Sequence, residues 1–226
     1  MNRIKKINQI QVNTKALETP QKLEIGTKTS ANFFRDPKWI LFTLSRYKFV
    51  SKMLIGRKNV FEVGCGDGFG ASIVQQAVGS LTCIELDARM ISESKKIHPF
   101  KNQIKFIQHD FIERPIKIIK YDACYCLDVL EHIDINYESQ FVDNICKSLH
   151  KNGIGIFGMP SLESQVYASQ ISKEGHVNCK SGDQLKLFMN KFFDTVFIFS
   201  MNDEVLHTGF HPMSQYLIAL CSHPKK

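Results

Sequence analysis

Apolar residues follow two spacings along most of the chain, short continuous runs and repeats of three or four residues. The runs predict five strands. We place them at residues 60–63, 81–86, 104–108, 121–127 and 154–159. Segments with a helical repeat lie between them, at residues 71–78, at residues 88–97 and after Asn136, which can cap the helix that follows it.

The last third of the chain changes character. Ser181 and Gln184 have the spacing of a capping box, which predicts the start of a helix. Two more apolar runs, at residues 195–199 and 216–221, predict strands joined by a long polar loop. We therefore expect a doubly wound α/β domain in which right-handed βαβ units build a mostly parallel sheet.

The N-terminal part has a different composition. Residues 1–35 show little periodicity and are rich in Lys, Gln, Asn and Thr, so we interpret them as a basic extension that is dispensable for folding. Asp36, followed by a proline, is typical of a helix start, and the apolar repeat after it predicts a helix over residues 36–54. The domain is accordingly expected to span residues 36–226, with its α/β core at residues 59–221.

The formal net charge of +7 is unevenly distributed. Residues 1–58 hold thirteen Lys and Arg against three acidic residues, and the remainder holds sixteen against nineteen. A basic arm can favour an anionic partner, although a solvated lysine-rich tail accounts for the same pattern. Because no stripe of interleaved basic and aromatic residues occurs outside the arm, we do not expect a nucleic-acid partner.

The seven cysteines are an odd number without C-x-x-C spacing, so neither a disulfide framework nor a zinc site is expected. Cys124 and Cys126 are predicted to share one face of a strand as small apolar side chains. No apolar run is long enough to span a bilayer, and the start of the chain lacks the apolar segment of a secretory signal. We therefore expect a cytoplasmic protein without membrane insertion.

The strongest chemical signal is the segment VFEVGCGDGFG, from Val60 to Gly70. A strand that opens into glycines before a helix lets the backbone approach a ligand closely. The dinucleotide fingerprint G-x-G-x-x-G would need a glycine where this chain has Phe69. Glu62 lies just before the first glycine, and a carboxylate there suits a sulfonium cation better than a pyrophosphate. These features favour S-adenosylmethionine over a nicotinamide dinucleotide.

Three further strand ends carry polar groups at the expected ligand-binding edge of the sheet. Glu85 ends the second strand, where a carboxylate can accept both hydroxyls of a ribose or be merely solvated. Asp110 follows the third strand and can accept a hydrogen bond from an adenine amino group, with Phe111 against the ring. The fourth strand ends at Leu127, and DVLEHI follows it at residues 128–133.

These four segments, in this order, resemble those of the class I S-adenosylmethionine-dependent methyltransferases. EVGCGDGFG is similar to their first motif, CIELD to the second, IQHD to the adenine-binding strand end and DVLEHI to the segment after the fourth strand. SLHKNGIGIFGMPS resembles their turn and fifth strand, although the turn Lys151-Asn152-Gly153 lacks the usual proline. The resemblance covers residues 36–221.

What the resemblance implies is a Rossmann-like fold with a seven-stranded sheet whose last strand is antiparallel, and S-adenosyl-L-methionine as the cofactor. The cofactor residues are carried over by position. They are Glu62, Gly64, Cys65, Gly66, Asp67, Gly68, Glu85, Leu86, Asp110, Phe111 and Leu127.

Motifs that do not occur in the sequence limit the class of methyl acceptor. The motifs that DNA amino-methyltransferases and cytosine methyltransferases carry after the fourth strand do not occur, which favours a small molecule. Residues 159–179 and 200–208 are dense in hydroxyls, amides and imidazoles, so a polar acceptor is expected. The same segments resemble methyltransferases of bacterial capsule and surface-polysaccharide pathways. That resemblance implies a sugar, nucleotide-sugar or phosphoramidate precursor as the acceptor, and a homo-oligomer is compatible with the sequence.

Methyl transfer depends mainly on positioning, and a base is needed only when the nucleophile must lose a proton. His132 and His176 are the candidate catalytic residues, because imidazole titrates near neutrality. Tyr167, Asn178 and Glu131 are candidates for binding the acceptor, although Glu131 can equally cap the following turn. No set of metal ligands is expected.

Arg46 can reach the carboxylate of the cofactor or lie at the surface. Two other functions are open at this stage. A dinucleotide-dependent oxidoreductase on the same fold is disfavoured by Phe69 and by the lack of a Y-x-x-x-K pair. A non-catalytic cofactor-binding scaffold is disfavoured by the intact acidic residues at positions 62, 85 and 110.

Overall fold

Eight strands form a single sheet in the computed structural model, which describes residues 22–117 and 120–225. The strand order is β3-β2-β1-β4-β5-β8-β6-β7. Five strands run parallel to one another, namely β1 (Asn59–Val63), β2 (Ser80–Glu85), β3 (Ile104–Gln108), β4 (Tyr121–Leu127) and β5 (Leu149–Pro160). They overlap the continuous apolar runs, because strands covered on both faces carry apolar residues throughout. β5 begins five residues before the predicted strand, so the turn expected at residues 151–153 lies within it.

The C-terminal strands are antiparallel to their neighbours. β8 (Tyr216–Pro224) lies between β5 and β6 (Phe193–Asn202), antiparallel to both. The predicted mostly parallel sheet with an antiparallel last strand is confirmed. The sheet has one strand more than the seven expected, because β7 (Val205–His207) pairs with the end of β6. Asp203, with a φ of 50°, turns the chain back within the segment that we predicted as a polar loop.

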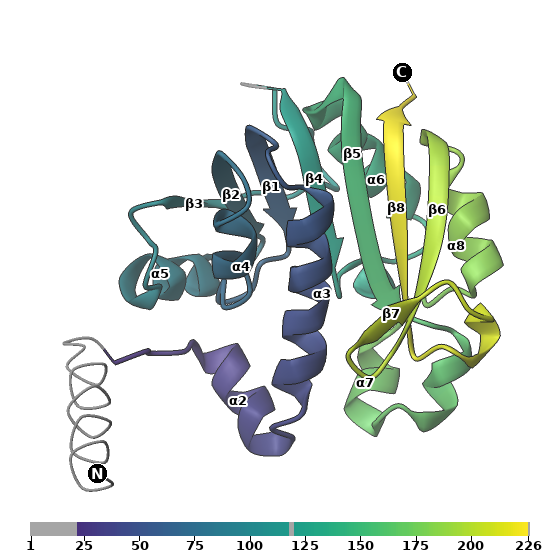
Figure 1. Ribbon diagram of the computed structural model, residues 1–226, viewed down its shortest axis with the longest axis horizontal. Helices are drawn as coiled ribbons and strands as arrows, with labels where there is room; N and C mark the ends of the chain where they lie inside the picture. The colour runs from purple at the N-terminus through teal and green to yellow at the C-terminus, as the bar shows by residue number, and fades with distance from the viewer. Residues whose placement is uncertain (1–21, 118–119, 226) are drawn as a thin grey trace, which may run out of the picture.

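Helices cover both faces of the sheet (Figure 1). One face carries α3 (Trp39–Met53), α4 (Ala71–Gln75) and α5 (Ala88–Ile97), and the other carries α6 (Glu138–Ser148) and α8 (Gly182–Met189). α2 (Thr27–Arg35) and α7 (Gln170–Gly175) lie at the end to which the parallel strands point. Short 3-10 helices cover Leu130–His132, Glu163–Tyr167 and His211–Met213.

Successive strand residues pack on opposite faces, and two apolar clusters result. Val60 packs in the cluster of α3 to α5, whereas Phe61 packs with Phe141 in the cluster of α6 and α8. Cys124 and Cys126 both belong to the second cluster, so they share a face as predicted. All seven cysteines are free thiols.

The predicted helix ends differ in accuracy. The capping box of Ser181 and Gln184 is present, since each side chain bonds the backbone of the other residue. Asn136 does not cap α6, because Tyr137 precedes that helix and Asn136 instead bonds the side chain of Asp134. α4 ends at Gln75, three residues earlier than expected.

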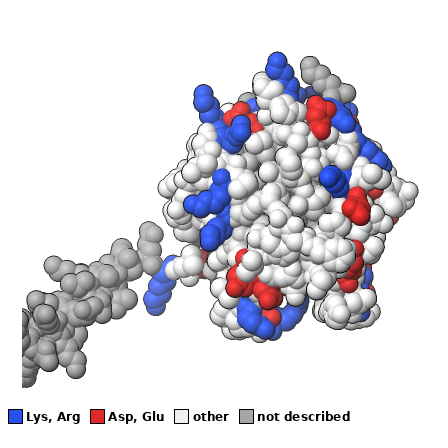
Figure 2. Space-filling view, turned by 45° about the vertical axis from the view of Figure 1, so that its right-hand side comes forward, with Lys and Arg blue, Asp and Glu red and all other residues white. Residues whose placement is uncertain are grey.

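Charged side chains are dispersed over the surface. On the face in Figure 2, Lys and Arg are spread around the edge, with Asp and Glu among them. None of the described helices is long and apolar enough to cross a membrane.

The expected domain boundary at residue 36 comes too late. α2 lies before it, and Thr29 on α2 is 2% exposed. The Thr29 backbone N and Oγ1 donate to the two carboxylate oxygens of Asp67, at 2.7 and 2.9 Å. α2 is held by these polar contacts rather than by a broad apolar face, so a periodicity search misses it. Residues 1–21 of the predicted extension lie outside the described residues.

Thr29→Ala is therefore expected to destabilise the domain by about 1–3 kcal/mol, because it removes a buried hydrogen bond to a carboxylate. Urea denaturation monitored by circular dichroism measures this loss. Thr27→Ala is the matched control, since its hydroxyl bonds Glu93 at an exposed position, and its effect is expected to stay within about 0.5 kcal/mol. Equal stability of the two variants would show that α2 is not anchored through Thr29.

Candidate active site

The loop after β1 turns sharply and approaches other elements closely. Gly64, Gly66 and Gly68 have φ angles of 76°, 57° and 75°, in the region that favours glycine. A Cβ atom on Gly64 would lie 2.2 Å from Val129 Cγ2, and one on Gly66 would lie 3.1 Å from Lys28 Cδ. Backbone conformation and space thus both require glycine, as in a loop that carries a ligand.

A cavity of about 330 Å³ lies at the carboxyl ends of β1 to β4. Five of the predicted cofactor residues line it, namely Gly64, Glu85, Leu86, Asp110 and Phe111. Its walls also include Lys28 of α2 and His132 from the segment after β4. The structure therefore brings the strand ends that sequence reasoning singled out into one cavity.

A smaller cavity of about 40 Å³ adjoins the first. Lys28, Gly64 and Asp128 line both, so the two cavities are adjacent, and we refer to them together as the cleft. The smaller cavity contains three more of the predicted cofactor residues, Cys65, Asp67 and Leu127. The cleft thus runs from the end of β3 to the glycine-rich loop.

The Glu85 carboxylate is fixed by backbone donors. Its Oε1 accepts from the N–H groups of Leu86 and Asp87 at 2.7 and 3.1 Å, and its Oε2 accepts from Gly66 N at 2.9 Å. Each carboxylate oxygen has two lone pairs, so capacity is left for hydroxyl donors from a ligand. Glu85 therefore links the glycine-rich loop to β2 and offers an oriented acceptor to the cavity.

Glu62 does not lie where we expected it. It is 1% exposed and lines neither cavity of the cleft. Its oxygens accept from Tyr47 Oη at 2.6 Å, Tyr125 Oη at 3.0 Å and Cys83 Sγ at 3.3 Å. Burial raises the pKa of Glu62, and these hydrogen bonds oppose the shift. Side chains alternate between the two faces of a strand, and Glu62 lies on the face that α3 covers. Its carboxylate therefore joins α3 to the sheet beneath the loop.

Asp67 and Gly68 stabilise the loop through contacts with neighbouring elements. Asp67 is bonded by Thr29, and a Cβ on Gly68 would lie 2.9 Å from the ring of Phe106. Cys65 is buried, and the pKa of its thiol is raised. Of these residues, Asp67 and Cys65 still contribute to the wall of the smaller cavity.

Two basic side chains lie close to the cleft. Arg46 Nη1 donates to both oxygens of Asp128, at 2.9 and 2.7 Å, and its guanidinium carbon lies 3.8 Å from the ring centre of Tyr216. Arg46 is therefore neither a surface residue nor a free cation. Lys28 lines both cavities instead, which sequence reasoning missed because α2 has no apolar repeat.

Glu131, His132 and His176 come together beside the larger cavity. One carboxylate or ring nitrogen atom from each lies within 4.8 Å of the others, and the two ring centres are 5.2 Å apart. Burial and the neighbouring Asp128 raise the pKa of Glu131 to about 8. Burial and the neighbouring His132 lower the pKa of His176. The two predicted catalytic histidines and one predicted acceptor residue thus form a single cluster.

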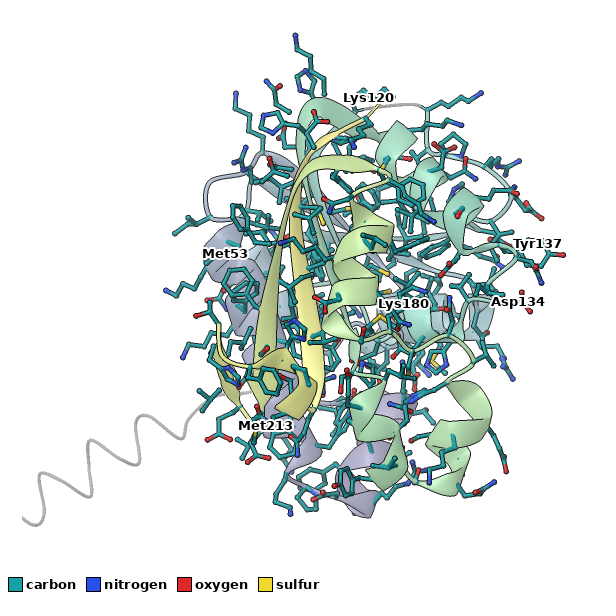
Figure 3. The ribbon with its side chains drawn as sticks, turned by 90° about the vertical axis from the view of Figure 1, so that its right-hand side faces the viewer. Met53, Lys120, Asp134, Tyr137, Lys180 and Met213 are labelled. Atoms are coloured by element: carbon teal, nitrogen blue, oxygen red, sulfur yellow. The ribbon has the colours of Figure 1, made fainter. Side chains whose placement is uncertain are left out.

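Asn178 is structural rather than available to an acceptor. It is 6% exposed, and its side-chain Nδ2 donates to Glu138 Oε2 and to the carbonyl of Ile133. Its Oδ1 accepts from Lys180 Nζ, which also pairs with Glu138 at 2.7 Å. Figure 3 shows Lys180 within the domain, whereas Tyr137 projects from its edge. Sequence proximity to His176 suggested an acceptor role, whereas in the structure the polar atoms of the Asn178 side chain are engaged in this buried network.

Tyr167 lies on the 3-10 helix after β5 and is 90% exposed. It lines neither of the two cavities that make up the cleft. Gln165 on the same turn contacts His176, a contact that sequence reasoning did not identify. Gln165 and His176 meet because the chain bends between them, and the spacing of residues in the sequence does not predict this bend.

Known proteins share this architecture. Residues 61–157 match the family model described as a methyltransferase domain. A ubiquinone biosynthesis O-methyltransferase from Rickettsia typhi (strain ATCC VR-144 / Wilmington) is 27% identical over 117 residues, which cover 50% of this chain and 45% of the relative. One of the same name from Rickettsia prowazekii (strain Madrid E) is 26% identical over 169 residues, covering 69% and 63%. The chain spans less than two thirds of the length of either relative.

A solved structure also resembles the fold. The N-methyltransferase NodS from Bradyrhizobium japonicum WM9, in complex with S-adenosyl-L-homocysteine, superposes with a TM-score of 0.60 at 19% identity. The match covers 85% of this chain and 88% of NodS.

Residues 61–157 thus match a methyltransferase domain, and the chain shares the fold of a solved methyltransferase that was determined with S-adenosyl-L-homocysteine. The relatives do not carry names that refer to capsule or surface-polysaccharide synthesis, so that part of the expected resemblance is not shown.

Proposed function

We propose that this protein transfers the methyl group of S-adenosylmethionine to a hydroxyl oxygen of a small acceptor. The observation that carries the proposal is the cleft at the carboxyl edge of the sheet. It combines an oriented carboxylate, Glu85, with a glycine-rich loop and the Glu131, His132 and His176 cluster at one side. The named relatives, both O-methyltransferases, support oxygen as the atom that is methylated.

The residues of the cleft fit the cofactor. Glu85 offers acceptor lone pairs for the ribose hydroxyls, and Asp110 and Phe111 offer an acceptor and an apolar surface for the adenine. Lys28 provides a cation for the carboxylate of the methionyl group, close to Gly66. When bound, the cofactor supplies a methyl group on positively charged sulfur.

The residues at the acceptor end have two tasks. Methyl transfer requires the acceptor oxygen to lie about 3 Å from the methyl carbon, so positioning provides most of the rate enhancement. A neutral hydroxyl must also lose its proton, for which an imidazole with a free ring nitrogen is suited. The lowered pKa of His176 keeps its ring neutral at physiological pH, and a neutral ring can accept that proton.

Glu85→Ala is expected to weaken S-adenosylmethionine binding by about 1–3 kcal/mol, or roughly fivefold to 150-fold, because two ribose hydroxyls lose their acceptor. Isothermal titration calorimetry with S-adenosylmethionine, S-adenosylhomocysteine and NAD measures this effect. Glu204→Ala in the turn between β6 and β7 is a control, since this exposed side chain lies outside the cleft. Unchanged affinity of Glu85→Ala would remove Glu85 from the ribose site. Binding of NAD in place of both sulfur compounds would overturn the proposed function.

The acceptor class is tested by S-adenosylhomocysteine release with a catechol, a nucleotide-sugar and a phosphoramidate. We expect the catechol to be methylated, because the relatives are named for O-methylation in ubiquinone biosynthesis. The polar residues of the predicted acceptor segments also serve the fold, as Asn178 does, which weakens the expectation of a sugar acceptor. Turnover of the nucleotide-sugar or the phosphoramidate alone would restore the polysaccharide precursor as the substrate.

A further inference from the structure

The Glu131 side chain has an unsatisfied acceptor in a buried position. It is 1% exposed, and its Oε2 atom has no hydrogen-bond partner among the described residues. Its backbone carbonyl accepts from Asn178 N at 3.0 Å, which holds the segment of His176 against the segment of Glu131. A buried carboxylate oxygen without a donor is costly, and a cation in contact with it removes that cost.

The proton positions on the two histidines follow from their partners. His132 Nδ1 lies 2.7 Å from the carbonyl oxygen of Gly175, which can only accept, so Nδ1 carries the proton. His176 Nδ1 lies 2.8 Å from Gln165 Oε1. The Gln165 amide is oriented by its own Nε2, which donates to the Ser161 carbonyl at 3.1 Å. Both Nε2 atoms therefore carry free lone pairs.

We propose that Glu131, His132 and His176 form a binding site for a divalent first-row cation such as Zn²⁺ or Mn²⁺. Two neutral imidazoles and one carboxylate are ligands that such cations prefer. Each histidine donates its other ring N–H to an oxygen acceptor, the arrangement that orients metal-ligating imidazoles.

The geometry requires only small side-chain movements. The three ligand atoms lie within 4.8 Å of one another, and two ligands on one Zn²⁺ ion are about 3.4 Å apart. Closing this difference moves each side chain by roughly 1 Å. Asp128 is left out of the ligand set, because Arg46 occupies both of its carboxylate oxygens.

The position of the site indicates a role for the cation in binding the acceptor. His132 lines the cofactor cavity, so coordination positions not taken by protein face the space beside it. A hydroxyl oxygen bound to the cation is held in place and loses its proton more readily, and the proton passes to solvent water, because His176 Nε2 then ligates the cation and no longer accepts it. This role rests on the proposed function, whereas binding of the cation itself does not.

The test uses the full chain without a histidine tag, stripped of metal and titrated with Co²⁺ and Zn²⁺. We expect one equivalent of Co²⁺ to bind, with visible d–d absorption from mixed nitrogen and oxygen ligands, and Zn²⁺ to displace it. Glu131→Gln, His132→Ala and His176→Ala are each expected to weaken binding at least 100-fold. Gln165→Leu, which removes the acceptor behind His176, is expected to weaken it about tenfold to 100-fold.

His150→Ala is the matched control, because this exposed histidine lies at the start of β5, away from the cluster. It is expected to bind cobalt as the wild type does. Circular dichroism and S-adenosylmethionine binding show that each variant folds. Absence of stoichiometric cobalt binding, or binding that survives all three ligand substitutions, would overturn the metal site. Because cofactor binding is measured separately, that result would leave the proposed methyl transfer standing.

Discussion

His176→Ala is expected to lower turnover by about 10²–10⁴-fold while S-adenosylmethionine affinity stays within about twofold. His176 lies in the cluster with Glu131 and His132, beside the cofactor cavity rather than within its lining. Its loss removes either the group that accepts the proton of the acceptor or a ligand of the proposed cation. Steady-state kinetics, with the acceptor that the S-adenosylhomocysteine release assay selects, measures turnover, and calorimetry measures cofactor affinity.

His132→Ala and His150→Ala complete this experiment. The first is expected to reduce turnover to a similar extent, because the two imidazole rings face the same space. The second is expected to retain wild-type turnover. A loss of less than about tenfold in His176→Ala would make it a residue that binds the acceptor, and a loss of cofactor affinity instead would place His176 on the wrong side of the cleft.

Glu62→Ala is expected to destabilise the domain by about 3–5 kcal/mol, the largest stability effect that we predict. The substitution leaves two buried tyrosine hydroxyls and one thiol without their acceptor and opens a cavity between α3 and the sheet. The melting temperature should fall by roughly 6–20 °C. Differential scanning calorimetry and urea denaturation measure these changes.

Two further variants distinguish a structural role of Glu62 from cofactor binding. Tyr47→Phe removes one of the three donors and is expected to cost about 1–2 kcal/mol. Glu62→Gln keeps an oxygen acceptor and is expected to be milder than Glu62→Ala. If Glu62→Gln were as stable as the wild type but bound S-adenosylmethionine at least tenfold more weakly, the carboxylate would belong to the cofactor site after all.

The order of strands and helices was determined by the sequence because it depends on local properties. Continuous apolar runs such as residues 121–127 mark strands covered on both faces, and the glycines at 64, 66 and 68 are required by positive φ angles. Parallel strands bring their carboxyl ends to one edge, so residues after β2 and β3 could be assigned to one cavity from chain order alone.

Tertiary structure decided which polar side chains face that cavity. Glu62 and Glu85 both lie on short strands beside the glycine-rich loop, yet Glu62 points to α3 and Glu85 to the cleft. The donors that engage Glu62 come from residues 47, 83 and 125, far apart in the chain. No local sequence pattern predicts that these three residues contact Glu62.

Contacts between distant segments also decide which residues lie at the two ends of the cleft. Lys28 enters the cleft only because Thr29 anchors α2 on Asp67, a pair of residues 38 positions apart. His132 and His176 were identified from their residue type, but their shared position beside Glu131 follows from the packing of the segments after β4 and β5. The sequence determined the fold and the chemistry available at its edge, because these follow from spacing and residue type. Contacts between distant segments decided which groups meet, because burial and hydrogen bonding are satisfied only in the folded chain.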